Sequence, residues 1–312
     1  MITLVVPTRN RAHTLRLVAP SYFAQDGVNE LIFVSDAGDD DTPTVIAEIA
    51  RDFPDKVWRM LRNETRLGAS QSRNVGVGAS TNEYILFCDD DEYLEVGYAR
   101  ILLQKLQAPN VGAVSGRRIY LTPGEGRANA LQRFGSGIGS SKTFRPLVCE
   151  YVNGAKFTGD IAIPVTNAII LTKKSLLQQF PFDSYYARGN GYREETDFQM
   201  NLFVHGFAIH VTNDCHSFHL PMSQVRTGGQ RTRPLKRLYW SIFYTNYFFG
   251  KYYERYAQRV GLRYPRWVAL LVFTLFSVYR ETLRPILHAM AMHVLARRRA
   301  SAERHPRPAG ES

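Results

Sequence analysis

The 312-residue sequence has few cysteines and no apolar segment of membrane-spanning length. Cys88, Cys149 and Cys215 are far apart and odd in number, which excludes a disulfide framework and a zinc knuckle and is typical of a reducing compartment. The run Trp267–Tyr279 has 13 residues without a charge, fewer than the roughly 20 that a spanning helix needs. No basic stretch precedes the first apolar run, Ile2–Val6, so we expect no signal peptide.

Acidic residues are also fewer than basic residues. Lys and Arg number 39 against 28 Asp and Glu, which gives a net charge of +11 and a pI of about 9.6. Such an excess indicates an anionic partner: nucleic acid, nucleotide phosphates or an acidic membrane surface. With 45% hydrophobic and 21% charged residues, the composition is that of a globular chain with a core, in one large domain or two smaller ones.

A buried-strand pattern that ends in carboxylates is the most informative feature. The stretch Tyr84–Cys88 carries no charge and is typical of a central strand; Asp89, Asp90, Asp91 and Glu92 follow directly. A solvated acidic turn or a helix N-terminus explains such a run equally well on its own. Open α/β sheets, however, bind ligands at the carboxyl ends of their strands, and carboxylates suit Mg²⁺ or Mn²⁺ bridging phosphates. We therefore favour a metal-diphosphate site.

Strand and helix patterns alternate along most of the chain. We predict strands at residues 2–6, 31–34, 57–61, 84–88, 111–120, 167–171 and 207–211. We predict helices at residues 11–22, 42–49, 68–78, 173–179 and 193–205, and a flexible loop at 135–141. This alternation predicts a parallel sheet of βαβ units, with residues 1–110 as a doubly wound nucleotide-binding half.

The composition changes from Pro234 onward. The segment Leu235–Arg259 is rich in aromatic and basic residues, Trp267–Tyr279 is apolar, and Arg297–Arg299 lies in a Pro/Arg/Ser tail. One interpretation is a buried core helix or helical hairpin. We favour the other, an interfacial helix on an anionic membrane surface, because basic flanks and aromatic residues coincide there.

The order and spacing of several motifs resemble the family-2 glycosyltransferases over residues 1–225. The first motifs are Pro7-Thr8-Arg9-Asn10, Asp36, Gly68 with Arg73-Asn74 and Gly76, and Asp89-Asp90-Asp91. The later motifs are Phe180-Pro181-Phe182-Asp183, then Arg193-Glu194-Glu195-Thr196-Asp197 and Gly206. The resemblance implies an inverting enzyme with an α/β, GT-A-like fold: a doubly wound, mixed but mostly parallel sheet flanked by helices. We expect a nucleotide-binding half (1–110), an acceptor half (111–225) and a helical, basic, membrane-associating extension (226–312).

The resemblance also implies roles for single residues. Asp36 is expected to read the base, Arg73 to lie near the base or the phosphates, and Asp91 to bind the metal directly with Asp89 as the other half of the Asp-x-Asp pair. Some members add a histidine ligand; His216 and His219 both qualify, and we prefer His219. The implied donor-binding residues are Pro7, Thr8, Arg9, Asp36, Gly68, Arg73, Asp89 and Asp90.

The catalytic base is expected in the acidic helix. The family usually has Glu-Asp where this chain has Glu194 and Glu195, which puts the base at Glu195 and leaves Glu194 as the alternative. Asp197 is three residues from Glu194 and shares its helical face, while Glu195 points about 100° away. Taken alone, these residues are more typical of a solvated acidic first turn, which the helix dipole favours. Inverting transfer needs a base for the acceptor proton and an electrophile for the leaving diphosphate, which two separate acidic groups can supply.

We therefore predict a hexosyltransferase that uses Mg²⁺ or Mn²⁺ and moves a sugar from a nucleotide-diphosphate sugar to a hydroxyl. Its acceptor is expected to be a carbohydrate or lipid-linked, in surface polysaccharide or glycolipid synthesis. We expect a cytoplasmic protein, peripheral at the inner face of the cell membrane, without a nucleic-acid partner. One alternative is a nucleotidyltransferase, which calls for a glycine-rich loop where residues 7–10 have no glycine. The other is a non-enzymatic basic binding protein, against which the acidic clusters at strand ends argue.

Overall fold

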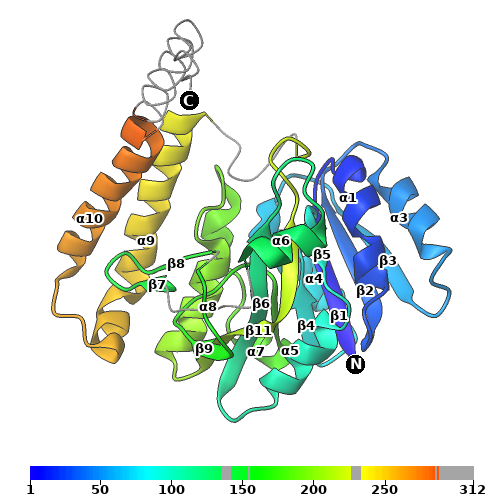
Figure 1. Cartoon of the computed structure of the whole chain (residues 1–312), viewed down its shortest axis with the longest axis horizontal. Helices are drawn as coiled ribbons and strands as arrows, with labels where there is room; N and C mark the ends of the chain where they lie inside the picture. The colour runs from blue at the N-terminus through cyan, green and yellow to red at the C-terminus, as the bar shows by residue number, and fades with distance from the viewer. Residues whose placement is uncertain (135–141, 154, 226–232, 285–286, 288–312) are drawn as a thin grey trace, which may run out of the picture.

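A nine-stranded sheet forms the centre of the molecule (Figure 1). The computed structural model describes residues 1–134, 142–153, 155–225, 233–284 and 287. The strand order is β3-β2-β1-β4-β10-β6-β11-β5, with β9 paired to β11. The strands are β1 (Ile2–Thr8), β2 (Val28–Asp36), β3 (Val57–Asn63), β4 (Tyr84–Phe87), β5 (Glu92–Leu94), β6 (Val111–Tyr120), β9 (Asp160–Ala162), β10 (Ile170–Lys173) and β11 (Ala208–His219). A separate hairpin joins β7 (Phe144–Arg145) and β8 (Glu150–Tyr151).

Most strands of the sheet run in one direction. β1 pairs in parallel with β2 and β4, β2 with β3, and β6 with β11. β10 is antiparallel to both β4 and β6, and β5 and β9 are antiparallel to β11. The predicted mixed, mostly parallel sheet is therefore confirmed, and the carboxyl ends of β1, β2, β4, β6 and β11 meet at one edge.

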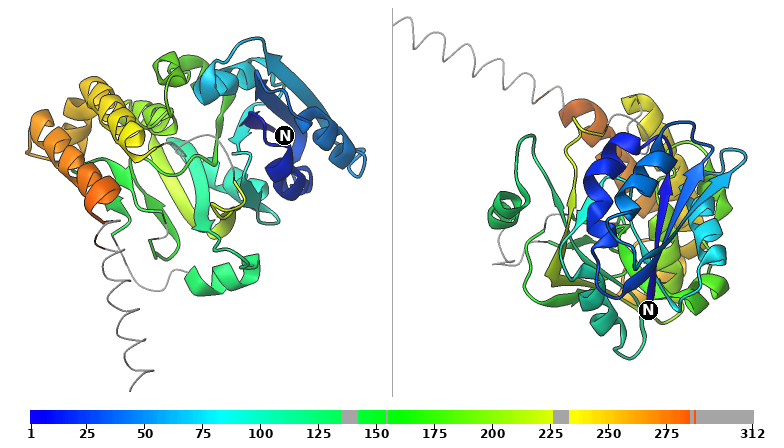
Figure 2. Two further views of the ribbon diagram at one scale, coloured as in Figure 1. Left: turned by 90° about the horizontal axis from the view of Figure 1, so that it is seen from above. Right: turned by 90° about the vertical axis from the view of Figure 1, so that its right-hand side faces the viewer.

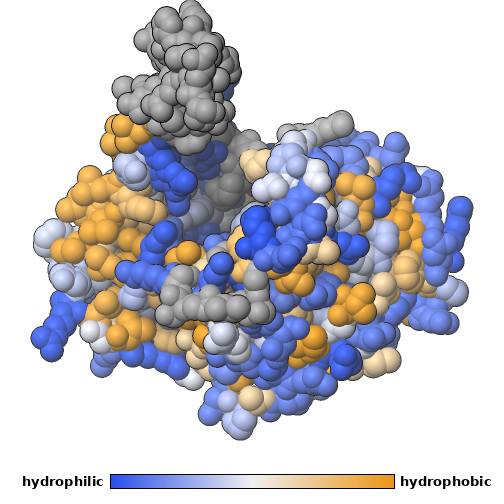
Figure 3. Space-filling view, in the orientation of Figure 1, coloured by the Kyte–Doolittle hydropathy of each residue, from blue (hydrophilic) through white to orange (hydrophobic). Residues whose placement is uncertain are grey.

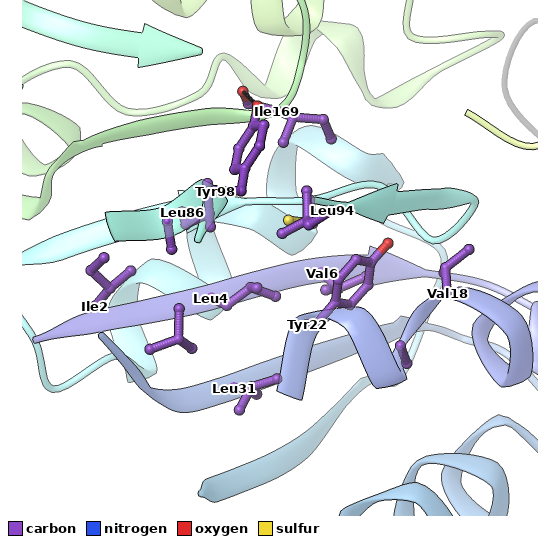
Figure 4. Close-up of a cluster of buried hydrophobic side chains, with 14 of the residues drawn as sticks. Ile2, Leu4, Val6, Val18, Tyr22, Leu31, Leu86, Leu94, Tyr98 and Ile169 are labelled. Atoms are coloured by element: carbon purple, nitrogen blue, oxygen red, sulfur yellow. Dashed lines mark hydrogen bonds between the residues drawn. The ribbon is translucent and has the colours of Figure 1, made fainter. Parts of the chain in front are cut away.

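Helices cover both faces of this sheet. Leu4 and Val6 of β1 face one core and Val5 faces the other, as the alternation of side chains in a strand requires. Figure 4 shows Tyr22 and Val18 lying over Val6 in the first core. The helices on that face are α1 (Ala12–Val18), α2 (Pro20–Phe23), α3 (Thr42–Ala50) and α5 (Tyr98–Leu106). Those on the other face are α4 (Gly68–Ala79), α7 (Lys174–Gln179) and α8 (Glu194–Val204), while α6 (Arg127–Phe134) packs on β6.

Two C-terminal helices follow: α9 (Pro234–Val260) lies beside α8, and α10 (Arg266–Val278) packs on the outer side of α9 (Figures 1 and 2). A π-helical turn, Tyr279–Leu283, follows α10. Phe248 and Tyr252 of α9, Ala269 of α10 and Met200 of α8 share one buried core. The predicted boundary near residue 225 stays a prediction. In the described part of the chain, no helix combines the length and apolar character needed to cross a bilayer.

Three predicted elements differ from the observed ones. The helix predicted at 11–22 is two helices, because Pro20 has no N–H to continue the first. The strand predicted at 167–171 begins only at Ile170, because the Asn167 side chain bonds the backbone of Ile169 and Gly116. The strand predicted at 207–211 continues to His219 through a bulge. The predicted loop at 135–141 and the arginines 297–299 lie outside the described residues.

Candidate active site

Acidic and basic side chains gather at the edge where the parallel strands end. Pro7 and Thr8 end β1, and Arg9 is exposed just beyond. The Thr8 hydroxyl donates to Asp90 Oδ2 at 2.8 Å, which ties the end of β1 to the acidic run after β4. His219, at the end of β11, pairs in register with Tyr120 of β6. The ligand edge that the sheet pattern predicts therefore carries the predicted residues.

Asp36 anchors the start of α4. Its carboxylate accepts from the backbone N–H groups of Leu67 at 2.7 Å and Gly68 at 3.0 Å, and from Asn63 Nδ2 at 3.0 Å. Gly68 has a φ of +81°, and a Cβ there would lie 2.9 Å from the backbone of Ala187. Both residues thus build the loop at the proposed nucleoside pocket. Their direct contact with a donor stays a prediction.

Arg73 joins the two acidic groups of the site. From α4, its buried guanidinium donates to Glu194 at 2.8 Å, and to Asp89 and Glu195 at 3.2 Å each. Burial alone would lower the pKa of Arg73, but the three carboxylates outweigh burial and raise it above its ordinary value. The resemblance implied that Arg73 lies near the nucleotide base or the phosphates. The structure places its guanidinium between the Asp-x-Asp segment and α8.

Glu194 and Glu195 differ in burial. Their side chains are 10% and 27% exposed, respectively. Burial raises the pKa of Glu194 to about 8, and the nearby Glu195 adds to this while Arg73 opposes it. At neutral pH a proton on Glu194 is therefore favoured. A protonated carboxyl cannot accept a proton, so Glu195 is the better placed of the two to act as a base.

Asp197 points away from the other two acids. Its carboxylate accepts from Lys251 at 2.8 Å and from the hydroxyls of Tyr186 and Tyr252 at 2.9 and 3.0 Å. Glu194 and Asp197 were expected to share a helical face, but their side chains have different partners. The long Glu194 side chain reaches Arg73, whereas the short Asp197 side chain stays against α9. The structure thus separates one predicted catalytic residue, Asp197, from the Arg73 cluster.

Asp91 and His219 face each other at the edge of the sheet. His219 Nδ1 lies 2.6 Å from the carbonyl of Leu220, which can only accept, so Nδ1 carries a hydrogen. Nε2 then presents a lone pair to Asp91 Oδ1, 3.6 Å away. Two facing acceptors suit an intervening cation, and the hydrogen bond at Nδ1 is the usual way of orienting a metal-binding histidine.

Asp89 is less available to a metal. It accepts from Arg118 at 2.7 Å and from Arg73, and these cations hold the pKa of its carboxyl below the usual range despite burial. Within the described ranges, no group of three or more His, Cys, Asp or Glu side chains is arranged to hold a metal. The residues fit a cation held by Asp91 and His219 that takes its other ligands from substrate phosphates and water.

Asp90 is partly buried, whereas Asp91 and Glu92 of the same run are buried. It accepts from Thr8 and lies 3.6 Å from Arg11 Nε. Burial raises its pKa to about 7, with Arg11 opposing and Asp91 adding to the shift. The protonation of Asp90, which lies beside the end of β1, therefore changes near neutral pH.

His216 is placed elsewhere. Its Nδ1 lies 3.0 Å from Glu95 Oε2, and the same carboxylate accepts its backbone N–H at 2.8 Å. Because 216 and 219 are an odd number of residues apart on β11, their side chains leave opposite faces. Of the two histidines that the sequence left open, the structure puts His219 beside Asp91.

Several residues of the site were missed by the sequence interpretation. Arg118 of β6 binds both Asp89 and Glu92, and its position inside an otherwise small and apolar strand was the signal that could have identified it. Arg193, with a φ of 79°, precedes α8 and donates to the carbonyl of Val148 at 2.9 Å. A non-glycine residue in this backbone region needs surrounding structure to hold it, and no local sequence pattern predicts it.

The sequence of this chain is similar to those of several known proteins. The family described as "Glycosyl transferase family 2" matches residues 3–180. An uncharacterized glycosyltransferase of Haemophilus influenzae is 34% identical over 116 residues, 36% of this chain and 37% of that protein. The "GalNAc(5)-diNAcBac-PP-undecaprenol beta-1,3-glucosyltransferase" of Campylobacter jejuni is 28% identical over 211 residues, 67% of this chain and 62% of that protein. The chain thus aligns with less than two thirds of the length of either relative.

Solved structures of similar fold include two with bound donors. S. aureus TarS 1-349 in complex with UDP-GlcNAc has a TM-score of 0.57 at 14% identity, over 89% of this chain and 72% of that one. The mannosyltransferase PcManGT from Pyrobaculum calidifontis, in complex with GDP-Man and Mn²⁺, has a TM-score of 0.57 at 16% identity, over 95% and 79%. At these identities the likeness concerns the fold, and the predicted GT-A-like architecture is confirmed.

Proposed function

Because the chain belongs to glycosyl transferase family 2, we propose that it moves a sugar from a nucleotide-diphosphate sugar to an acceptor hydroxyl with inversion. One observation carries the proposal: Arg73 holds Asp89, at the donor edge, and Glu194 and Glu195, at the start of α8, around one buried charge. The acidic segment after β4, which carries the proposed metal ligand Asp91, and the proposed base are thereby fixed close together, as inverting transfer requires.

The charged residues of the site have different proposed roles. Glu195 accepts the proton of the attacking hydroxyl, while Glu194, protonated and bonded to Arg73, orients that guanidinium. Asp91 and His219 hold Mn²⁺ or Mg²⁺, which when bound supplies positive charge to the leaving diphosphate. The imidazole favours a transition metal such as Mn²⁺ over Mg²⁺, because Mg²⁺ prefers oxygen ligands.

The donor and acceptor classes are suggested by the relatives. Structures of similar fold carry UDP-GlcNAc or GDP-Man, and the Campylobacter jejuni relative is named for an undecaprenol-diphosphate acceptor. We propose a nucleotide-diphosphate hexose as donor and a carbohydrate, carried on a lipid diphosphate, as acceptor. This chemistry belongs to surface polysaccharide or glycolipid synthesis.

The outer face of α10 suits a membrane surface. Trp267, Leu271 and Leu275 follow at four-residue spacing on one side of the helix and are between 49% and 66% exposed. Figure 3 shows this apolar band on the side of the molecule where α10 lies. Exposed arginines stand at both ends of the helix: Arg263, Arg266 and Arg284. We propose that this face rests on anionic lipid, which makes the protein peripheral at the inner face of the cell membrane.

A panel of nucleotide-sugars tests the donor proposal. One donor should raise the melting temperature in Mn²⁺ and release free sugar slowly, with water as acceptor. EDTA should abolish both effects, and Asp91→Asn should weaken donor binding and abolish sugar release. Full activity in EDTA contradicts the metal assignment. Release of pyrophosphate instead of free sugar supports a nucleotidyltransferase.

A further inference from the structure

A polar hollow of about 390 Å³ lies between the β7–β8 hairpin, the start of α8 and the π-helical turn after α10. Hydroxyl and amide groups dominate the part of its wall nearest α8 and β8. These groups belong to Tyr151, Asn153, Thr166, Tyr192 and Thr196. No residue of this wall took part in the donor edge described above.

The hollow adjoins the proposed chemistry on two sides. On one side, Thr196 follows Glu195 directly in the first turn of α8. On the other, Asn153 Nδ2 donates to the Tyr120 hydroxyl at 3.4 Å, and the Tyr120 ring lies 5.0 Å from the His219 ring. The hollow therefore lies beside the helical turn that carries the proposed base, and it is linked through Asn153 and Tyr120 to the proposed metal ligand.

One hydroxyl in the wall has no partner. Among the described residues, nothing accepts from or donates to the buried Tyr151 hydroxyl. Burial raises the pKa of Tyr151 to about 12, so the group stays a hydrogen-bond donor at neutral pH. A buried hydroxyl without a partner is costly, and a ligand that supplies one recovers that cost.

The three arginines of the wall have partners within the protein. Glu150 lies 3.4 Å from Arg145 and 3.9 Å from Arg280, and its carboxylate also accepts from the Tyr192 hydroxyl at 2.9 Å. Arg193, the third arginine, donates to two backbone carbonyls and to a threonine hydroxyl. Because the arginines turn to these groups, they offer few free donors to a phosphate. Aromatic rings with hydroxyl and amide groups match a neutral sugar, which has apolar ring faces and hydroxyls at its rim.

We propose that this hollow binds the acceptor saccharide, the sugar residue whose hydroxyl attacks the donor. The inference rests on the proposed glycosyl transfer and assigns its second substrate to a place in the fold. Arg280, after α10, lies in the wall, so the C-terminal helices complete the acceptor site.

Ligand-observed NMR with methyl glycosides of common hexoses and N-acetylhexosamines tests the assignment, with the full chain in the presence of nucleoside diphosphate and Mn²⁺. At least one glycoside should bind. Tyr151→Phe should weaken that binding about threefold to tenfold, the worth of one hydrogen bond. Asn153 is exposed on the rim, so Asn153→Trp should block the hollow and abolish glycoside binding.

Tyr84→Phe is the matched control, because its hydroxyl bonds Gln107 at the far end of β4; it should leave glycoside binding unchanged. Donor binding by the wild type, measured in Mn²⁺ without nucleoside diphosphate, tests the glycosyl-transfer proposal separately. If the donor binds but no glycoside does, or if glycoside binding survives both Tyr151→Phe and Asn153→Trp, the hollow is not the acceptor site.

Discussion

At the scale of single residues, Arg73 holds the site together. Its guanidinium contacts three carboxylates from two distant segments, and its side chain is only 2% exposed. A buried cation is tolerated only when its charge is compensated. The acidic groups therefore do two things: they serve the proposed chemistry, and they neutralise the residue that positions them.

The three acids of α8 should respond differently to neutralisation. Glu195→Gln should lower the rate of sugar release about 10²–10⁴-fold while donor Kd stays unchanged, because only the base is lost. Glu194→Gln and Asp197→Asn should cost less in rate. The measurements are kcat for donor hydrolysis and donor Kd by calorimetry. Near-normal kcat in Glu195→Gln together with an inactive Glu194→Gln moves the base to Glu194.

The raised pKa of Glu194 predicts a pH dependence of stability. The folded protein binds this proton up to about pH 8, whereas the ordinary pKa is 4.5, so the group's stabilising contribution is complete below pH 4.5 and is lost as pH rises toward 8. Glu194→Gln removes this loss. Between pH 5 and pH 8, the variant's free energy of unfolding, measured in urea, should therefore fall less than that of wild type.

The control for this experiment is Glu48→Gln, at an exposed ion pair with Arg16. Its unfolding free energy should follow that of wild type across the same pH range. Parallel curves for wild type and Glu194→Gln show that Glu194 does not keep its proton in the folded protein.

At the scale of elements, α8 is held in place by α9. Lys251 of α9 donates to Asp197 of α8 and, at 2.7 Å, to Asp183 in the turn before it. Thr245 accepts from Arg193 Nε at 3.2 Å, at the residue that precedes the helix. The C-terminal helices therefore fix the helix that carries the proposed base.

Lys251→Met should test this link. The change leaves Asp197 buried without its cation, which should lower the free energy of unfolding by about 2–4 kcal/mol, somewhat less than for a fully buried pair because Lys251 is 28% exposed. Urea denaturation measures the loss, and the double variant with Asp197→Asn should lose less than the sum of the single variants. Lys236→Met, exposed on the same helix, should change stability by less than about 0.5 kcal/mol. An additive double variant shows that the two residues do not interact.

The elements also show what sequence reasoning can and cannot reach. β6 was predicted with its observed bounds because its run of apolar and small residues is uninterrupted until Arg117. The continuation of β11 was not predicted, because the polar stretch Thr212–Asp214 interrupts the strand pattern. In the structure a bulge accommodates this stretch. β7, β8 and β9 have two or three residues each, too few to show a period.

The candidate site was predictable to a similar degree. Asp90 and Asp91 follow directly from a strand pattern, and Glu195 from the resemblance. The association of Arg73 with Glu194 joins residues 121 positions apart, and depends on the tertiary fold that brings α4 to the first turn of α8. The orientation of the Asp197 side chain depends on its contact with Lys251, a distant residue that the local helical periodicity cannot predict.

At the scale of the whole molecule, excess positive charge and the apolar face of α10 predict lipid binding. Replacing Trp267, Leu271 and Leu275 with Ser should weaken co-sedimentation with anionic liposomes about 10²-fold, because each partly inserted side chain contributes roughly 1 kcal/mol. Binding of wild type should also weaken as salt rises, because lipid charges are screened.

The matched control replaces three exposed apolar residues elsewhere with Ser: Leu17, Val57 and Val96. It should sediment with liposomes as wild type does. Equal binding by both triple variants, or no binding of wild type at low salt, rules out α10 as the attachment surface.

The bond between Arg193 and Thr245 has a consequence for how the molecule is assembled during synthesis. The two residues are 52 positions apart, and Lys251 follows Asp197 by 54. The strands that end at Thr8, Asp36 and Phe87 are all translated earlier than either pair. A growing chain can therefore form the edge for the nucleotide before it can secure the helix for proton transfer, so binding capacity precedes catalytic competence on the ribosome.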